Sequence, residues 1–421
     1  MRGTRLAPDA PRATPVPIAP MPIRSMSVLT ALLHVYIALR LVPALASLTW
    51  LWPLLLLALV LSAASIPLPF VSRRIARSAP RADVLKWIGL ISMGWFSSMF
   101  VLTALRDIAL LLGWGATALG GWPMPWAAVI PWSAVAVVGI ATATSLIGFV
   151  NARRTAGVKH VEVPIAGLPL ALHGFTIAQL SDIHVGPTIK RGYIQRIVDA
   201  VNGLGADVIA ITGDLVDGSV PELRDHIAPL ADLRARHGTF VVTGNHEYYA
   251  GAHAWIVELR RLGLTVLLNE HVLLRGRAAR SAQTDEEENA NALVLAGVTD
   301  FSAGHFDAAH HSDPRGALRG APPEATTRVL LAHQPRSAAA AADAGFRLQL
   351  SGHTHGGQFF PWNLFVPLQQ PFTAGLHKLR DMWVYVSRGT GYWGPPKRFG
   401  APSEITLLRL IPSESSRRSP L

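Results

Sequence analysis

Five short clusters of polar residues contain the side chains whose types could do chemistry in this chain. In sequence order they are Asp182-Ile183-His184, Gly213-Asp214, Gly244-Asn245-His246-Glu247, His333, and Gly352-His353-Thr354-His355. The sequence has no cysteine, which excludes disulfide scaffolds, thiol nucleophiles, cysteine-ligated zinc and iron–sulfur clusters. Carboxylate, imidazole and carboxamide groups without thiolate suit Mn, Fe or Zn better than copper or a structural zinc. The clusters therefore predict a metal site.

The number of candidate ligands indicates two metal ions. Two carboxylates, four or five imidazoles and one amide are more than a single ion binds. Two divalent ions about 3.5–4 Å apart would use all of them, provided that one carboxylate bridges the ions. Such a pair polarises a phosphoryl oxygen and lowers the pKa of a bridging water, which makes hydroxide available for in-line attack on phosphorus. The expected chemistry is hydrolysis of a phosphoester.

Each cluster follows a short apolar run that is typical of a buried strand. These runs are Phe175–Leu180, Val208–Thr212, Thr239–Thr243, Val329–Ala332 and Leu348–Leu350. Helical spacing occurs at Tyr193–Val201, Pro221–Ala235 and His253–Arg261, and further strands are expected at Leu293–Ala296, Trp383–Val386 and Ile405–Leu410. Loops at the carboxyl ends of strands in an α/β sheet converge on one crevice. We therefore expect the five clusters to meet in space.

Each cluster taken alone also has an ordinary interpretation. An Asp-x-His segment is usually a turn with a satisfied histidine, and Gly-Asp after a strand is commonly a turn or a helix cap. The combination of all five, each at a strand end, favours the metal site. The glycines beside the clusters permit the tight turns that bring backbone close to a metal or a phosphate.

The first 152 residues have a different character from the rest. Half of the whole chain is hydrophobic and only 15% is charged, against about 25% in an ordinary soluble domain. Four apolar stretches are candidate membrane spans: about Met26–Leu39, Leu48–Val71, the nineteen uncharged residues between Lys86 and Arg106, and Trp126–Val150. We expect Gly113–Pro125 to interrupt the pattern between the last two. A large buried helical core is the alternative, but uncharged runs of this length are rare in soluble helices.

The distribution of basic residues predicts the orientation in the membrane. Residues 1–150 contain 11 Lys and Arg against 3 Asp and Glu, so the basic excess lies in the apolar half and favours lipid contact over nucleic-acid binding. With four spans, the basic groups before the first span, between the second and third, and after the fourth all fall on one side. The positive-inside rule then predicts a multi-pass inner-membrane protein with both termini and the catalytic domain on the cytoplasmic side.

The chain is thus expected to have five parts. They are a disordered tail (1–25), a membrane domain with about four transmembrane helices (26–152), a linker (153–169), a catalytic α/β domain (170–412) and a second disordered tail (413–421). Within the catalytic domain, Arg275–Asn291 is expected to be a solvated insertion loop. His310 and His311 stand near Asp307 and Asp313 in another expected loop, where adventitious surface metal binding is the most that we expect.

The five clusters in this order resemble the signature of the calcineurin-like metallophosphoesterases, over about residues 170–412. Ser387-Arg388-Gly389-Thr390-Gly391, Pro395, Arg398 and Pro402–Ile405 are similar to the bacterial subgroup that includes the YkuE and YaeI proteins, and the apolar N-terminal part resembles the transmembrane members of that group. The resemblance implies a four-layer-type α/β fold, in which two packed sheets are flanked by helices, preceded by an all-α transmembrane bundle.

The resemblance also implies roles for individual residues. The ligands of one metal ion would be Asp182, His184 and His355, those of the other Asn245, His333 and His353, and the bridging carboxylate Asp214. His246 would contact the phosphate and protonate the leaving oxygen, and Glu247 is expected to orient a neighbouring imidazole. Arg388 and Arg398 are expected either to bind substrate phosphate or to form structural ion pairs.

These observations predict a membrane-anchored enzyme with two divalent ions (Mn, Fe or Zn) that hydrolyses a phosphodiester or pyrophosphate bond. The subgroup resemblance and the membrane location favour a lipid-linked substrate such as UDP-2,3-diacylglucosamine, and nucleic acid is not an expected partner. The aromatic and proline-rich stretch Phe359–Phe372 is either an apolar lip against lipid or ordinary packing under a loop. Two alternatives stay open: hydrolysis of soluble nucleotides or phosphoprotein, and a membrane sensor or scaffold with a structural metal site. The sequence leaves the oligomeric state open.

Overall fold

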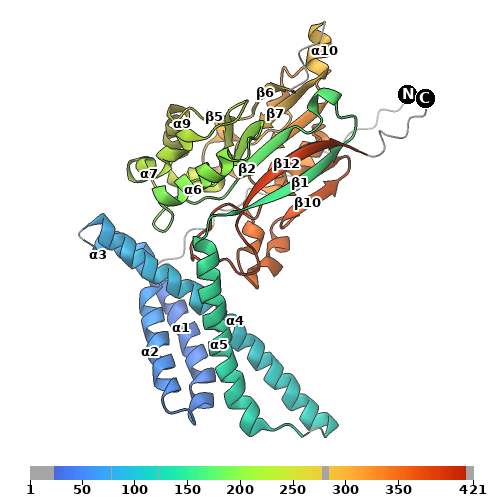
Figure 1. The fold of residues 1–421 in the computed structure, drawn as a ribbon. Helices are drawn as coiled ribbons and strands as arrows, with labels where there is room; N and C mark the ends of the chain where they lie inside the picture. Colours follow the sequence, from blue (N-terminus) through green and yellow to red (C-terminus); the bar gives the residue numbers. More distant parts are fainter. Residues whose placement is uncertain (1–22, 77, 122, 277–283, 414–421) are drawn as a thin grey trace, which may run out of the picture.

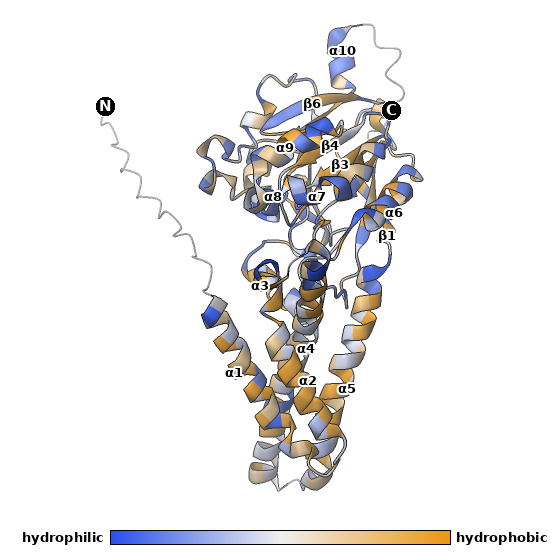
Figure 2. Ribbon diagram, turned by 90° about the vertical axis from the view of Figure 1, so that its left-hand side faces the viewer, coloured by the Kyte–Doolittle hydropathy of each residue, from blue (hydrophilic) through white to orange (hydrophobic). Residues whose placement is uncertain are grey.

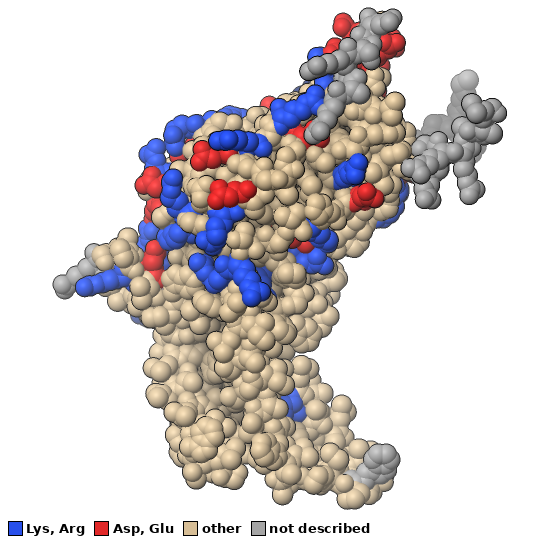
Figure 3. Space-filling model, in the orientation of Figure 1, with Lys and Arg blue, Asp and Glu red and all other residues tan. Residues whose placement is uncertain are grey.

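The computed structural model describes residues 23–76, 78–121, 123–276 and 284–413. Most of both expected tails therefore lies outside the described residues. The described chain consists of a bundle of apolar helices below an α/β domain (Figure 1). Hydrophobic residues dominate the bundle (Figure 2), and on the face drawn in Figure 3 the charged side chains gather on the α/β domain and at its junction with the helices. The change in composition along the sequence is thus also a division in space.

The helical part contains α1 (Ile23–Leu41), α2 (Leu51–Ser65), α3 (Leu68–Ile75), α4 (Ala79–Gly120) and α5 (Trp126–Arg153). Three of them, α1, α4 and α5, are long and apolar enough to cross a membrane, and the number is four if α2 and α3 are taken as one bent span. The axes of α2 and α3 differ in direction by 63°. Pro67 lies at the bend, where its ring and missing N–H do not allow a continuous helix.

One expectation for the bundle is wrong. The interruption expected at Gly113 does not occur, and α4 continues through it to Gly120. A Cβ atom at Gly113 would lie 3.1 Å from the Trp126 ring of α5, so the glycine makes room for the indole. The helix ends where Gly121 adopts the left-handed conformation that closes many helices.

The α/β domain has two six-stranded sheets. The first has the order β1 (Gly157–Ile165), β12 (Glu404–Pro412), β2 (Thr176–Leu180), β3 (Val208–Thr212), β4 (Thr239–Val242), β5 (Thr265–Val266). The second has the order β10 (Gly375–Leu379), β11 (Met382–Val386), β9 (Leu348–Ser351), β8 (Thr327–Leu331), β7 (Ala292–Gly297), β6 (Glu270–Arg275). Strands β2, β3 and β4 run parallel, as do β7, β8 and β9, whereas β12 is antiparallel to β2. In the second sheet β10 is antiparallel to β11 and β6 to β7, so both sheets are mixed.

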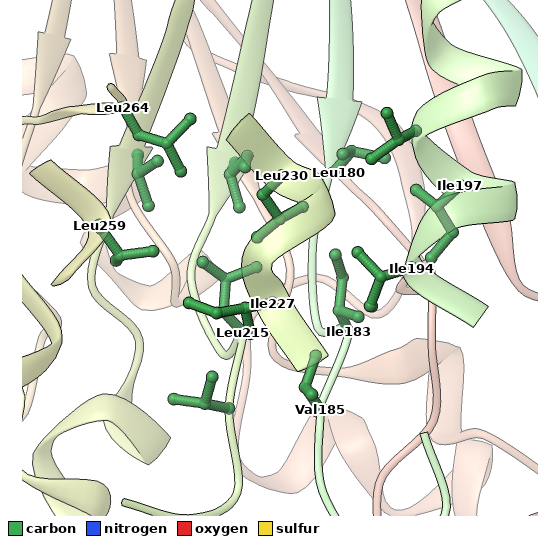
Figure 4. Packing of buried hydrophobic residues seen from close by; sticks show 14 of the residues in the cluster. Leu180, Ile183, Val185, Ile194, Ile197, Leu215, Ile227, Leu230, Leu259 and Leu264 are labelled. Atoms are coloured by element: carbon green, nitrogen blue, oxygen red, sulfur yellow. The ribbon is translucent and has the colours of Figure 1, made fainter. Parts of the chain in front are cut away.

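Helices and three clusters of buried apolar residues hold the two sheets in place. On the outer side of the first sheet lie α6 (Arg191–Asn202), α7 (Val220–Ile227) and α9 (Ala252–Arg261), and Figure 4 shows Leu180, Ile194 and Ile227 of this layer packed together. A second cluster that includes Ile177, Val208 and Val329 fills the space between the sheets. The helix α11 (Ala338–Asp343) contributes to a third cluster on the second sheet. The prediction of two packed sheets flanked by helices is confirmed.

Several segments differ from the expected elements. Residues 157–165, expected as linker, form β1, which pairs with β12 from Gly157 opposite Glu404 to Ile165 opposite Pro412. Lys159, His160 and Glu162 interrupt the apolar residues there, so the short apolar run that indicated the other strands is missing. The helix expected to reach Ala235 changes at Ala228 into a 3₁₀ turn that contains Pro229. Two further short helices, α8 (Asn245–Ala250) and α10 (Asp285–Ala290), follow β4 and lie in the expected insertion loop, respectively.

A lysine from the α/β domain enters the helical bundle at the junction. Lys397 is 3% exposed, and its ammonium donates to the carbonyl of Gly94 at 3.1 Å and to Ser145 Oγ at 2.9 Å. A Cβ atom at Gly148 would lie 2.7 Å from Lys397 Cγ, so this glycine opens the path. The next residue, Arg398, donates its backbone N–H to the Gly148 carbonyl at 2.8 Å. The α/β domain is therefore anchored directly on α4 and α5.

Candidate metal centre

The predicted site residues lie just past the carboxyl ends of strands from both sheets. Asp182 follows β2, Asp214 follows β3, His333 follows β8 and His353 follows β9. Asn245 is the first residue of α8, directly after the turn that leaves β4. All seven predicted ligands come together there, as the convergence of strand ends predicts.

The first group of potential ligands is Asp182, His184 and His355. His184 Nε2 lies 3.0 Å from His355 Nε2, and His355 Nε2 lies 3.6 Å from Asp182 Oδ1. All three residues are buried. A carboxylate and two imidazoles that face one another at such distances are suited to a divalent cation of the Mn, Fe or Zn type.

The second group is Asn245, His333 and His353, and the Asp214 carboxylate lies next to it. His333 Nε2 lies 3.1 Å from Asp214 Oδ2, 3.2 Å from Asn245 Oδ1 and 3.2 Å from His353 Nδ1. His333 Nδ1 donates to the carbonyl of Thr212 at 2.8 Å, so Nε2 is the nitrogen that is free to bind a metal. This group can hold a second ion.

Asp214 lies between the two groups. Its Oδ2 atom is 3.1 Å from His333 Nε2 in one group and 3.8 Å from His184 Nε2 in the other. Burial raises the pKa of Asp214, but the surrounding imidazoles, His333 foremost, outweigh this effect and hold the pKa well below its ordinary value. An ionised carboxylate in this position is suited to bridge two ions.

The backbone at the site adopts a conformation that is costly for residues with a side chain. In the described parts of the chain, eight non-glycine residues have positive φ, and five of them are predicted ligands: Asp182, His184, Asp214, His353 and His355. Such left-handed positions persist only where the surrounding structure enforces them, and they gather at functional sites. Their concentration here marks the pocket as the specialised part of the fold.

Small and apolar neighbours hold these positions. A Cβ atom at Gly352 would overlap Ser181 Oγ and Asp182 Oδ2, so only glycine permits the close approach of the last cluster to the first. Ile183, between the two ligands of the first cluster, is fully buried in the core beside Ile194 (Figure 4). Alternate residues thus point into the site and into the hydrophobic core.

Asp217 is a site residue to which the sequence assigned no role. Its Oδ1 atom accepts from His184 Nδ1 at 2.9 Å and from His246 Nδ1 at 2.7 Å. Burial raises the pKa of Asp217, but the two imidazoles outweigh it and lower the pKa to about 2. One ionised carboxylate therefore fixes a predicted ligand and the predicted acid together. Its position three residues after Asp214 is the only signal in the sequence.

The role expected for Glu247 is wrong. Its carboxylate does not orient an imidazole; it accepts from the backbone N–H groups of Asp214 at 2.9 Å, Leu215 at 2.7 Å and Gly244 at 2.7 Å. Buried N–H groups of two loops thus donate to the same carboxylate. A buried carboxylate in turn needs such donors, because its charge is costly to bury without hydrogen bonds. Glu247 ties the second cluster to the third through the backbone.

The two arginines also differ from each other. Arg388 forms an ion pair with Glu404 at 3.1 Å. Of the two expected roles, this is the structural ion pair and not the binding of substrate phosphate. Arg398 is fully buried; Nη2 donates to His355 Nδ1 at 2.9 Å and Nη1 to the His355 carbonyl at 3.0 Å. Burial lowers the pKa of His355 well below its ordinary value, and the charge of Arg398 lowers it further. Arg398 is thus neither exposed to substrate nor paired with a carboxylate.

His246 occupies the open side of the site. Its Nδ1 is held by Asp217, and its Nε2 lies 4.0 Å from Asp214 Oδ2. The rings of Tyr249 and Trp393 lie against it, with centroid distances of 5.3 Å and 5.9 Å. An imidazole oriented by a carboxylate, with its other nitrogen directed at the reacting centre, is arranged for proton transfer.

Another cluster of potential ligands lies outside this pocket. His253 Nε2 is 3.0 Å from Asp307 Oδ2, and His310 lies close to both. His310 Nδ1 is 2.8 Å from the hydroxyl of Tyr248. The His253 side chain is 74% exposed. The surface cluster thus contains His310 and Asp307, as expected, together with His253. His311 and Asp313 are not part of it.

Comparison with known proteins agrees with this geometry. The family model described as calcineurin-like phosphoesterase matches residues 175–357. A "Transmembrane protein with metallophosphoesterase domain" from Bos taurus is 43% identical over 279 residues, which are 65% of this chain and 61% of that protein. The chain therefore matches about three fifths of the length of this relative.

Two bacterial relatives are matched over more of their own length. An "Uncharacterized metallophosphoesterase" from Aquifex aeolicus is 32% identical over 237 residues, 56% of this chain and 84% of that protein. The "Uncharacterized metallophosphoesterase YkuE" from Bacillus subtilis is 29% identical over 252 residues, 58% of this chain and 81% of that protein. The resemblance inferred from the five clusters is confirmed.

Proposed function

Because this chain belongs to the calcineurin-like metallophosphoesterases, we propose that it hydrolyses a phosphodiester or pyrophosphate bond with two divalent metal ions, Mn, Fe or Zn. The observation that carries the proposal is the pair of buried ligand groups on either side of the Asp214 carboxylate. Bound metal ions supply a polarised phosphoryl oxygen and a water of lowered pKa. The protein itself positions the metal ligands and the substrate relative to one another.

We assign the ligands as the two groups divide them. One ion would be held by Asp182, His184 and His355 and the other by Asn245, His333 and His353, and Asp214 would be shared between them. Asp217 and Arg398 orient two of these imidazoles, at 2.9 Å from His184 Nδ1 and 2.9 Å from His355 Nδ1.

The proton for the leaving group comes from His246. Asp217 holds its Nδ1, so that Nε2 faces the bridging carboxylate and the open side of the pocket. In this position Nε2 contacts a phosphate oxygen and donates a proton to the leaving oxygen.

The site works at a membrane surface. The α/β domain contacts α4 at Ser97 and α5 at Gly148. From Ser97, α4 continues to Gly120 over about 35 Å, and from Gly148, α5 extends back to Trp126 over about 33 Å, which are sufficient for a hydrocarbon core of about 30 Å. Arg73 and Arg153 contact the α/β domain, and Lys86 lies next to Asp83, which pairs with Lys190 of that domain; these basic groups on its side of the segments support a cytoplasmic location at the inner membrane.

A substrate with a lipid part fits this location best. The metal pocket is confined to within a few nanometres of lipid, and the subgroup resemblance favours a lipid-linked pyrophosphate such as UDP-2,3-diacylglucosamine. Soluble nucleotides and phosphoprotein are the competing substrates.

Replacement of His246 by Ala separates an enzyme from a structural metal protein. An enzyme should lose turnover while elemental analysis of the purified full chain still finds the bound metal, because His246 is not a ligand in this assignment. Joint loss of metal and stability would instead indicate a structural centre. Turnover of soluble diesters together with inert lipid-linked pyrophosphates would overturn the lipid assignment alone.

A further inference from the structure

A cavity of about 610 Å³ connects the metal pocket to the helical bundle. One end is lined by His353 and His355, which belong to different ligand groups. The other end is lined by Leu33 of α1 and by Met93 and Phe96 of α4. Its volume lies within the range of small-molecule sites, about 300–1,000 Å³. The cavity therefore joins the reacting centre to the membrane-spanning part of the chain.

The wall of this cavity is predominantly apolar. Between the two ends it is formed by Phe100, Phe359, Trp362, Phe365 and Val366, among others. Two polar groups of the wall already have partners: the Trp362 indole N–H donates to Ser97 Oγ at 3.0 Å, and the Gln358 amide donates to the Trp393 carbonyl at 2.8 Å. Apart from His353 and His355, few side chains of the wall could form hydrogen bonds with a bound molecule.

The segment that closes the cavity presents exposed apolar side chains beside the bundle. Phe360, Trp362, Leu364, Phe365 and Leu368 are 45–80% exposed. Two short 3₁₀ turns, Trp362–Leu364 and Val366–Leu368, carry most of them, and Trp362 contacts α4 through Ser97. A continuous apolar patch of this kind marks a contact with lipid or a partner, and its position at the top of the apolar helices favours lipid. A chain that enters from the bilayer thus meets an apolar lip and then the cavity.

We propose that this cavity binds an acyl chain of the substrate while the phosphoester reaches the metal ligands His353 and His355. The inference rests on the proposed function, and it assigns a separate chain-binding site with Leu33, Met93 and Phe96 as its wall on the side of the helical bundle. The occupant is the chain of an amphiphilic phosphoester and not a resident bilayer lipid. The site selects substrates by chain length, since each buried CH₂ group adds to binding until the cavity is full.

The test uses the full-length protein in detergent micelles with Mn²⁺ and three probes that differ only in chain length. These are methyl, octyl and dodecyl 4-nitrophenyl phosphate, with kcat/KM measured for each. For the unaltered protein we expect kcat/KM to be at least about tenfold higher for the dodecyl than for the methyl ester.

Two variants place the effect in the cavity. Leu33→Trp fills the end on the side of the helical bundle, and Leu32→Trp is the matched control, because Leu32 is the preceding residue of α1 and is 61% exposed. Leu33→Trp should lower the dodecyl-to-methyl ratio at least about fivefold, and Leu32→Trp should leave it unchanged. Met93→Trp fills the cavity from α4 and replaces Leu33→Trp if that variant does not fold.

The outcomes separate the inference from the function on which it rests. Equal turnover of the three esters overturns the chain-binding site, and so does a dodecyl preference that Leu33→Trp and Met93→Trp leave intact, since a resident lipid or the micelle would then explain it. In both cases hydrolysis that depends on His246 still supports the proposed function. Failure to hydrolyse even the methyl ester with Mn²⁺ bound argues against the phosphoesterase function itself.

Discussion

Two clusters of histidine and aspartate in this molecule have the same composition and similar spacing but differ in burial and in the contacts that support them. In the metal pocket, Asp214, His333 and His353 place their ligand atoms within 4.8 Å of one another, and the surface cluster of His253, Asp307 and His310 meets the same condition. Residue type and distance therefore do not distinguish the two clusters.

Burial is the first difference. His333 is 1% exposed and Asp214 is 2% exposed, whereas the His253 side chain is 74% exposed. Water can solvate the charges of the surface cluster at little cost. Charges in the pocket are tolerated only if they are paired, hydrogen-bonded or bound to a cation.

The second difference is the support around the ligands. In the pocket, five predicted ligands have left-handed backbone, and Asp217, Arg398 and the Thr212 carbonyl each hold an imidazole. In the surface cluster, His310 contacts the Tyr248 hydroxyl and Asp307 accepts from the nearby Ala309 N–H. A preorganised site thus differs from an accidental one by its outer contacts, and substitutions at three levels can test this difference.

The largest effect is expected from Asp214→Asn, which removes the charge between the two ligand groups. We expect turnover to fall by more than about a hundredfold, beyond the loss typical of an outer-contact residue, and the metal content of the purified protein to fall. Elemental analysis together with hydrolysis of 4-nitrophenyl esters checks both. Full metal content with unimpaired turnover would show that the pocket does not depend on this carboxylate, and the pocket would then not differ from the surface cluster as a metal site.

Asp217→Asn should have an intermediate effect. The amide keeps one acceptor oxygen but loses the charge that orients His184 and His246, so we expect metal affinity or kcat to fall about 10–100-fold. Titration of the metal-free protein with Mn²⁺, followed by activity, measures this change. If the variant had the metal affinity and kcat of the original protein, the contacts of Asp217 would be dispensable. Burial would then be the main difference between the pocket and the surface cluster.

His253→Ala should have the smallest effect. An exposed side chain away from special features contributes within about 0.5 kcal/mol to the free energy of unfolding, and it supports none of the pocket ligands in the described residues. Thermal unfolding, metal content and turnover should all stay close to those of the original protein. Loss of one equivalent of bound metal would show that the surface cluster is a metal site in its own right.

The sequence predicted the site better than it predicted the elements around it. The ligand clusters stand in short segments beside buried strands, so local pattern was sufficient for them. By contrast, β1 was expected as linker because polar side chains interrupt its apolar residues, and its pairing depends on β12, more than 240 residues away. The role of Glu247 was missed for the same reason, since its acceptors face the backbone of a different loop.

By itself, the sequence determined which chemistry is available and where the apolar helices lie, because ligand types, strand patterns and uncharged runs are local properties of the chain. Only the tertiary structure decided that Asp217 orients two imidazoles, that Arg398 holds His355, and that an apolar cavity leads from the pocket to α1 and α4. These features arise from contacts between residues that are far apart in the chain. Their energies depend on burial and direction, and neither is expressed in a local pattern of residue types.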